Sequence, residues 1–487
     1  MASYAVEVSW DNTGAFSGQY DDITGVTEQA TISRGRESEF DQMEVGRLEL
    51  QVDNSDRRFS PGYASSVIGA SNLVPRRPIR IRMTSGSVSG ALFYGYIKRI
   101  KPQPKIGNRT MATIEAEDAL SQFQRANATV SLQQGVTTGC ALGLGLDAIG
   151  FPSASRSIDT GGDSLAYFWV RDQNAKQLFD DLARSEGGIY FINASGGFTF
   201  KSRSYNYTNQ TSSASFSNVF DEFDYDLSDE KIYNDVRLTA HPRTTASNTT
   251  IWSLGDIPVM AGSTSASFWS VYTNPSSLES VPALNVASPV VTTDYTMNSL
   301  ADSSGSNLTT NAVVSFSDFG ETGKAIVTNN GSTQFFVTKL QIRGAPLHAP
   351  NPIQKRSDDA TSTSAYQQRT LEMDLVWQQD SNQAQSAADW FLGIYKNPVP
   401  RVAMGYVAER SNDLLAQSIQ RELAERISIT ETVNGISGQD YFIGRIDHQI
   451  ELGGRRHLVR YILEKAPDAT YWILEVSQID LNAYLAY

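Results

Sequence analysis

The sequence predicts a mainly β protein with a minor α+β part: two β-barrel domains, a small α+β domain and an inserted β-sandwich. Three observations lead to this class. Short alternating segments follow one another from Trp10 to Phe123 with almost no helix signal. Helical periodicity is confined to a few stretches further along the chain. Residues 244–346 are dense in Ser, Thr and Asn and read as strands and turns.

The size and charge of the chain limit the function classes. At 487 residues and 40% hydrophobic content, it is long enough for three or four domains. Its 40 basic and 53 acidic residues give a net charge of −13, which is poorly suited to holding nucleic acid by its phosphates. The single cysteine, Cys140, excludes an intrachain disulfide, and we expect it to be an inert buried thiol.

Targeting segments are not evident. Residues 1–5 lack the basic segment and apolar run of a secretory signal, and no run of about 18 apolar residues predicts a membrane-spanning segment.

Residues 1–125 form the first predicted barrel. Apolar and polar residues alternate from Leu48 to Asp53 and again from Ile79 to Met83, which is typical of strands with one buried and one solvated face. The solvated faces carry charges of both signs, as a subunit interface or a channel lining would.

Residues 126–231 form the small α+β domain. A short helix is expected within Gly139–Ile149, and a clearer one over 174–185, ended by Gly187 and Gly188. A hairpin follows over 189–201.

Residues 232–243 and 347–487 form the second predicted barrel, interrupted by the sandwich of 244–346. Its elements are a helix over 381–396, two strands joined at Gly453-Gly454, and a final strand over 471–476. For the sandwich core we expect the anchors Trp252, Trp269, Phe316 and Phe335-Phe336.

No cluster in the sequence predicts catalysis. Of the four histidines, His448 and His457 flank a predicted hairpin and could approach each other, but we expect exposed strand histidines and not a metal site. Gly143–Ala148 matches a dinucleotide fingerprint without the βαβ context that it needs. The acidic pairs are expected to be solvated; they are Asp21-Asp22, Asp180-Asp181 and Asp221-Glu222. We therefore predict no catalytic, cofactor-binding or metal-binding residue, no cofactor, and a protein that is not an enzyme.

Four basic pairs lie beside predicted strands or turns. Two interpretations stay open: solvated edges that discourage wrong strand pairing, or partners for acidic strands of another subunit. The pairs are Arg57-Arg58, Arg76-Arg77, Lys98-Arg99 and Arg455-Arg456.

An ordered set of short motifs resembles the hub, or tail-tip, proteins of tailed phages, the family related to the central baseplate hub of contractile tails. The resemblance covers most of 1–240 and, more loosely, 365–465. The motifs that carry it are Ile32-Ser-Arg-Gly-Arg36, Leu48-Glu-Leu-Gln-Val-Asp-Asn54, Arg58-Phe-Ser-Pro61, Leu92-Phe-Tyr-Gly-Tyr-Ile97, Leu146-Asp-Ala-Ile-Gly150, Glu186-Gly-Gly188 and Asn234-Asp-Val236.

This resemblance implies a structural virion protein, assembled in the host cytoplasm and located at the tail tip or baseplate. It implies a homotrimer in which each chain supplies two tube-like β-barrel domains. The ring would adapt a hexameric tail tube to a threefold tip and provide an acidic channel for DNA ejection. The implied partners are tail tube and distal tail proteins, other tail-tip, spike or fibre proteins, the tape-measure protein, and DNA in transit.

Two alternatives remain at this point. In the first, residues 244–346 act as a receptor- or carbohydrate-binding module that contacts a host surface glycan. In the second, the chain is a cell-wall hydrolase, for which the sequence offers no pair of acids at a defined separation.

Overall fold

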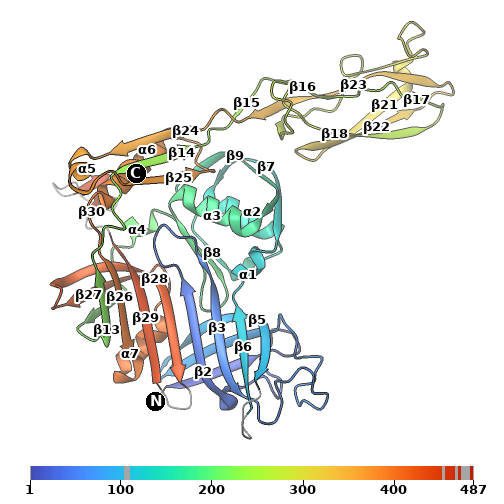
Figure 1. Ribbon diagram of the computed structural model, residues 1–487. Coiled ribbons are helices and arrows are strands. Elements are labelled where there is room, and N and C mark those ends of the chain that lie inside the picture. The colour runs from blue at the N-terminus through green and yellow to red at the C-terminus, as the bar shows by residue number, and fades with distance from the viewer. Residues whose placement is uncertain (1, 104–109, 452–455, 467–469, 473–482, 486–487) are drawn as a thin grey trace.

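The computed structural model describes residues 2–103, 110–451, 456–466, 470–472 and 483–485. Strands hold 46% of the chain and helices 16%, which confirms the mainly β class. Figure 1 shows a large sheet at the base, a small α+β unit above it, and an elongated β arm at the top. The predicted Gly453-Gly454 turn and residues 473–476 of the predicted last strand lie outside the described residues. Residues 470–472 pair instead in a small ribbon, with strands β30 Thr470–Trp472 and β31 Ala483–Leu485.

The large sheet contains twelve of the described strands and joins both ends of the sequence. Its main path runs β1-β4-β5-β6-β3-β2-β28-β29-β26-β13, and β27 branches from β28 and carries β12. The first half holds β1 Ser3–Val8, β4 Pro78–Ser85, β5 Val88–Gln103, β6 Met111–Glu117, β3 Glu44–Asp53 and β2 Thr27–Gly35. The second holds β28 Ile436–Glu451, β29 Arg456–Lys465, β26 Arg401–Val407, β13 Glu222–Asp226, β27 Arg426–Glu431 and β12 Ala214–Ser217.

The two halves meet where β2 pairs with β28 in antiparallel register, with Ile32 opposite His448. The path ends at β1 and β13, so the described strands close no barrel. The two separate barrels expected from the sequence are therefore replaced by one open, shared sheet. Period-two patterning specifies which face of a strand is buried but not which strand lies beside it, and that is why the joint could not be predicted.

Burial under this sheet follows the alternation that the sequence displays. Leu48, Leu50 and Val52 are at most 1% exposed, whereas Glu49 between them is exposed. The core continues without a break into the α+β unit. Short helices cover the ends of the sheet: α1 Leu120–Phe123, α7 Asn412–Gln420, η1 Thr24–Val26 and η4 Ala408–Arg410.

The α+β unit confirms the predicted helix and hairpin. The helix, α3 Ala175–Glu186, begins where the Asn174 side chain accepts a hydrogen bond from Gln177 N, and it ends at Gly187, whose φ is 73°. The hairpin strands β10 Ile189–Ile192 and β11 Phe198–Lys201 pair antiparallel. The remaining elements are β7 Asn127–Thr137, α2 Thr138–Ala148, η2 Ser153–Ser155, β8 Arg156–Ile158, β9 Ser164–Asn174 and α4 Tyr205–Thr208.

A separate three-stranded sheet lies beside this unit, and the arm extends from its strands (Figure 1). Its strands are β24 Ile353–Asp358, β14 Asp235–Ala240 and β25 Thr370–Leu375. Helix α6, Ser381–Tyr395, packs against it and confirms the helix predicted for 381–396; α5 Ala360–Tyr366 is the shorter neighbour. Residues expected in one second barrel thus divide between this sheet and the large one. The four-domain division itself stays a prediction.

The arm consists of two sheets that share an apolar core. In the six-stranded sheet, the long strand β23 Phe335–His348 pairs with β15 Thr244–Thr245, β16 Thr249–Ser253, β17 Val259–Met260, β19 Ala283–Leu284 and β20 Tyr295–Asn298. The three-stranded sheet holds β18 Ser265–Val271, β22 Thr322–Asn329 and β21 Ala312–Asp318, with η3 Thr309–Asn311 before β21.

The expected core anchors of the arm divide into two groups. Phe335 is fully buried, and Trp252 and Phe316 pack partly buried against the core. Phe336 is half-buried and lies outside this core cluster. Trp269 is 62% exposed, so its assignment as an anchor was wrong. The residue after it in β18, Ser270, is buried, because successive side chains on a strand point to opposite faces.

Candidate functional site

One candidate functional surface is the polar face of the large sheet, opposite its core. Arg99 in β5 lies opposite Glu115 in β6, which lies opposite Glu49 in β3. The same row continues through Thr31 in β2 to Gln449 in β28. Directly opposite residues in antiparallel strands share a face, so one polar row crosses the joint between the two halves.

Charges of both signs occupy this face and pair with one another. Lys98 donates to Glu117 at 2.5 Å, and Arg99 forms an ion pair with Glu115. One of the four predicted basic pairs, Lys98-Arg99, therefore forms its ion pairs within its own chain. These bases are solvated, so their ion pairs set the charge pattern more than the stability.

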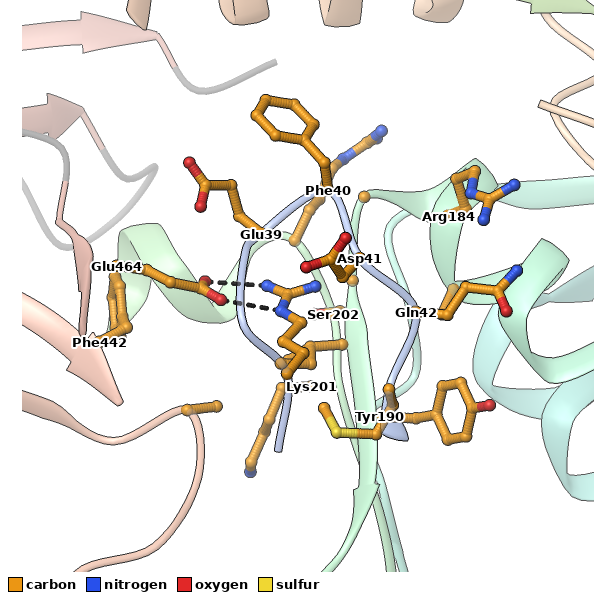
Figure 2. Close-up of a pocket in the computed structure, with 18 of the residues that line it drawn as sticks. Glu39, Phe40, Asp41, Gln42, Arg184, Tyr190, Lys201, Ser202, Phe442 and Glu464 are labelled. Carbon is orange, nitrogen blue, oxygen red and sulfur yellow. Dashed lines mark hydrogen bonds and ion pairs between the residues drawn. The ribbon is translucent and has the colours of Figure 1, made fainter. Parts of the chain in front are cut away.

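A cavity of about 180 Å³ lies behind the sheet, where the β2–β3 loop of residues 36–43 reaches the α+β unit and α6. Figure 2 shows the Glu464 carboxylate, from the second half of the sheet, directed at the loop that carries Glu39 and Phe40. Arg36 binds Glu464 through two hydrogen bonds of 2.8 Å. Burial opposes the guanidinium charge, but the adjacent carboxylate outweighs it and raises the pKa of Arg36.

The same loop attaches α6 to the sheet. The Phe40 ring lies 4.9 Å from that of Tyr395 and 5.2 Å from that of Tyr233. Glu39 accepts from Lys231 at 2.8 Å. Gly35, with φ of 116°, directs the chain into this loop, and a Cβ there would clash with the backbone of Gly444 in the neighbouring strand. The cavity is therefore lined by groups that hold three parts of the molecule together.

The two strand histidines approach each other as expected, but their expected exposure was wrong. His448 Nδ1 and His457 Nε2 are 2.9 Å apart, and both residues are at most 2% exposed. Tyr4 Oη lies 3.2 Å from His457 Nδ1. Burial lowers the pKa of His457 to about 3, and burial followed by the charges of His457 and Arg34 lowers the pKa of His448. The pair is a neutral hydrogen-bonded chain inside the core.

Other expectations for single residues need correction. Cys140 is exposed, because α2 turns Ala141, Leu142 and Leu146 inward and leaves the preceding residue on the solvent side. Asp180 is buried and binds Lys176 at 2.8 Å, so this acid is not solvated.

The remaining acidic pairs and motifs also have structural roles. Asp21 is buried too, and it accepts from the Gly18 backbone N–H at 2.8 Å. Asp221 pairs with Arg410 at 2.8 Å. Gly143–Ala148 lies within α2, after a strand that belongs to a two-stranded ribbon and not to a βαβ unit. Within the described ranges, no group of three or more His, Cys, Asp or Glu residues is placed to hold a metal ion.

No helix in the described part of the chain is both long and apolar enough to cross a membrane.

Comparison with known proteins identifies the fold. No family model and no curated protein sequence matches the chain. The 43 kDa tail protein of prophage MuSo2 from Shewanella oneidensis aligns with a TM-score of 0.50 at 8% identity, over 95% of this chain and 97% of that one. The chain has the fold of a phage tail protein.

Two further tail proteins align over similar lengths. The tail protein from Neisseria meningitidis MC58 aligns with a TM-score of 0.50 at 10% identity, over 95% of this chain and 97% of that one. The prophage tail protein gp18 from Listeria monocytogenes EGD-e aligns with a TM-score of 0.43 at 10% identity, over 95% of each chain. The two alignments with a TM-score of 0.50 each cover 95% of this chain, so the tail-protein fold extends over nearly its whole length.

Sequence reasoning missed two features of this tail-protein fold: the exposed Trp269 and the charged free edge at β13. The edge had a signal, because acidic and aromatic residues alternate through Glu222-Phe-Asp-Tyr-Asp226. Trp269 had none, since an exposed and a buried tryptophan have the same local sequence pattern.

Proposed function

We propose that this chain is a structural phage tail hub subunit, related to the central baseplate hub, that assembles into a trimeric ring at the tail tip. The observation that carries the proposal is the shared sheet. Strands β5-β6-β3-β2 from one half and β28-β29-β26-β13 from the other form one antiparallel surface with a common polar face. Three chains would present six such four-stranded units, which matches a hexameric tube above and a threefold tip below.

In this proposal the polar face lines a channel for DNA ejection. Carboxylates on the face repel phosphate, and the bases Lys98 and Arg99 are held by acids of their own chain, so DNA passes without adhesion. The acidic lining follows from the net charge of −13 and stays a prediction, because the described charges on this face have both signs.

The proposal includes the partners and location that such a hub requires. Tail tube and distal tail proteins would bind one end of the ring, and tip, spike or fibre proteins and the tape-measure protein the other. We keep the four-domain division. Because the sheet of one chain is open, the tube-like barrels would close only when subunits associate. The chain would act in the virion and have no enzymatic activity.

The mass of the purified protein in solution tests the ring. Light scattering should give about three times the 53.4 kDa of the chain. A monomer that also fails to assemble on tail tubes would contradict the hub. A sixfold assembly would instead indicate a layer of the tube itself.

One observation favours a second function, glycan binding by the arm. On the outer face of the three-stranded sheet, Trp269 and Phe319 are 62% and 53% exposed, and their rings stack with centroids 5.9 Å apart. Lys324 lies opposite Trp269, and Ser317 lies opposite Lys324. An exposed aromatic plate beside hydroxyl and ammonium donors has the chemistry that binds the apolar face and the hydroxyls of a sugar ring.

Replacement of the indole tests this second function. Trp269→Ala should lower binding to host surface polysaccharide by about tenfold, because one stacked aromatic contributes on the order of 1–3 kcal/mol. Val313→Ala, an equally exposed residue of the same sheet, is the matched control and should bind as the parent does. Equal binding by both variants would remove glycan recognition from this face.

A further inference from the structure

Two of the unpaired edges of the polar sheet lie at β13 and along part of β5. Strand β13 pairs with β26 on one side, and no described strand lies on its other side. In the first half of the sheet, whose path ends at β1, β4 pairs with β5 only as far as Tyr96, while β6 pairs with the rest of β5. No strand in the described part of the chain therefore covers the outer edge of residues 98–101. Unpaired backbone N–H and C=O groups at such an edge form a template for another strand.

The two edges carry opposite charge. Glu222, Asp224 and Asp226 are all exposed on β13, and none forms an ion pair among the described residues. On β5, Lys98, Arg99 and Lys101 are all exposed, and Lys98 and Arg99 also pair with Glu117 and Glu115 of β6 in their own chain.

Both sets of charges lie on the polar face. Glu222 lies opposite Gly405, which lies opposite Arg460. Arg460 in turn lies opposite Asp447, in a row that crosses β2 and reaches Arg47 in β3, two residues from Glu49, before it continues into β6. Glu49 belongs to the row of Arg99, so the acids of one edge and the bases of the other point to the same side of the sheet.

Strand direction also fits contact between copies. All seven pairings from β5 to β13 are antiparallel, so these two edge strands run in opposite directions. If sheets of two copies lie side by side with their polar faces continuous, β13 of one is antiparallel to β5 of the other. The contact joins different edges, and a head-to-tail contact of that kind closes into a ring when the rotation between neighbouring copies divides a full turn.

We propose that β13 of one subunit pairs with residues 98–101 of β5 in the next subunit, and that three such contacts close the ring. The partner is a second copy of this chain, and the number three rests on the proposed function. The carboxylates of β13 lie against the ammonium and guanidinium groups of β5. Pro102, which has no N–H donor, ends the pairing.

Charge at these edges also excludes wrong partners. If the charges served only to keep the edges solvated, one sign on both edges would suffice. With opposite signs, β13 repels a second β13 and β5 repels a second β5, whereas β13 attracts β5. The pattern thus specifies a head-to-tail contact and rejects both head-to-head arrangements.

Charge reversal at each edge tests the contact, with sedimentation velocity at low salt as the measurement. The acidic-edge variant is Asp224→Lys with Asp226→Lys, and the basic-edge variant is Arg99→Glu with Lys101→Glu. Each variant alone places like charges at all three contacts and should weaken trimer formation by about tenfold or more. The chain with all four substitutions has opposite charges at every contact again. Its dissociation constant for the trimer should lie within about threefold of the parent value.

Controls separate this contact from folding and from the hub proposal. Asp256→Lys with Glu279→Lys reverses two exposed acids of the arm and should leave the trimer intact. Circular dichroism and thermal melting check that each variant folds, and Lys101→Glu alone replaces the basic-edge variant if the loss of the Arg99–Glu115 pair unfolds it.

A parent trimer that neither edge variant weakens, or a fourfold variant that stays monomeric, would overturn the edge contact and leave the hub standing. A parent chain that never trimerises would overturn the hub itself.

Discussion

At the residue scale, the least expected group is the neutral chain of Tyr4, His457 and His448 in the core of the large sheet. Both histidines come from β28 and β29, near the joint of the two halves. Because their pKa values are lowered in the folded protein, the unfolded chain binds more protons at mildly acidic pH. The stabilisation that they provide as neutral groups is complete above the unfolded pKa of about 6.5 and is lost as pH falls from there toward about 3.

Replacement of one member of this pair should flatten the acid response. Below pH 6.5, His457→Gln should reduce the pH slope of the unfolding free energy by up to about 1.4 kcal/mol per pH unit, since one titrating group is removed. Urea titrations between pH 7 and pH 4.5 measure that slope. His348→Gln, at an exposed site, should leave it unchanged. Identical slopes for the parent and His457→Gln would show that the pair does not couple to folding.

The pH slope of His457→Gln must be compared with that of the parent, because Asp118 changes the unfolding free energy with pH in the opposite direction. Burial raises its pKa to about 7, so its contribution to stability is fully present below its unfolded pKa of about 3.9 and is lost as pH rises through about 7. The slope of the parent alone contains both effects, and only the comparison isolates the histidines.

At the scale of elements, the connections between units depend on a few long side chains. The loop of residues 36–43 holds α6 through Glu39 and Phe40. The arm begins beside Arg243, whose guanidinium lies 4.7 Å from the Trp169 ring centroid and 4.1 Å from that of Trp377. Burial lowers the pKa of Arg243 to about 10, and it donates to the backbone oxygens of Tyr167 and Val376 at 3.4 Å.

Arg243→Ala should loosen the base of the arm. Two cation–π contacts of roughly 0.5–2 kcal/mol each are lost, together with the packing of the side chain between the rings. Small-angle scattering should then show a broader distribution of maximum dimensions, with a lower melting temperature. Arg125→Ala, on an exposed side chain, is the control and should change neither quantity. An unchanged scattering profile for Arg243→Ala would mean that other contacts orient the arm.

At the scale of the whole molecule, assembly and arm are structurally separate. The polar sheet and both of its edges lie at the opposite end of the molecule from the arm (Figure 1). The chain enters the arm in β15 and leaves it in β23, and these strands pair with Thr245 opposite Leu347. One short loop could therefore replace everything between them.

Replacement of residues 246–346 by a short Gly/Ser linker should leave trimer formation unchanged while it abolishes any glycan binding of the arm. Light scattering measures the first and polysaccharide pull-down the second. Loss of the trimer with retained circular dichroism would place a subunit contact in the arm and contradict the separation of the two activities.

The sequence determined the local structure. The alternation from Leu48 to Asp53, the stop at Gly187 after α3 and the helix of 381–396 are all confirmed, because each depends on periodicity or on a single residue's backbone preference. Only the tertiary structure decided which strands lie side by side: β2 against β28, β13 at a free edge, and His448 against His457. Those contacts join residues from distant parts of the chain, and a pattern of period two records the face that a strand buries but carries no information about its neighbour.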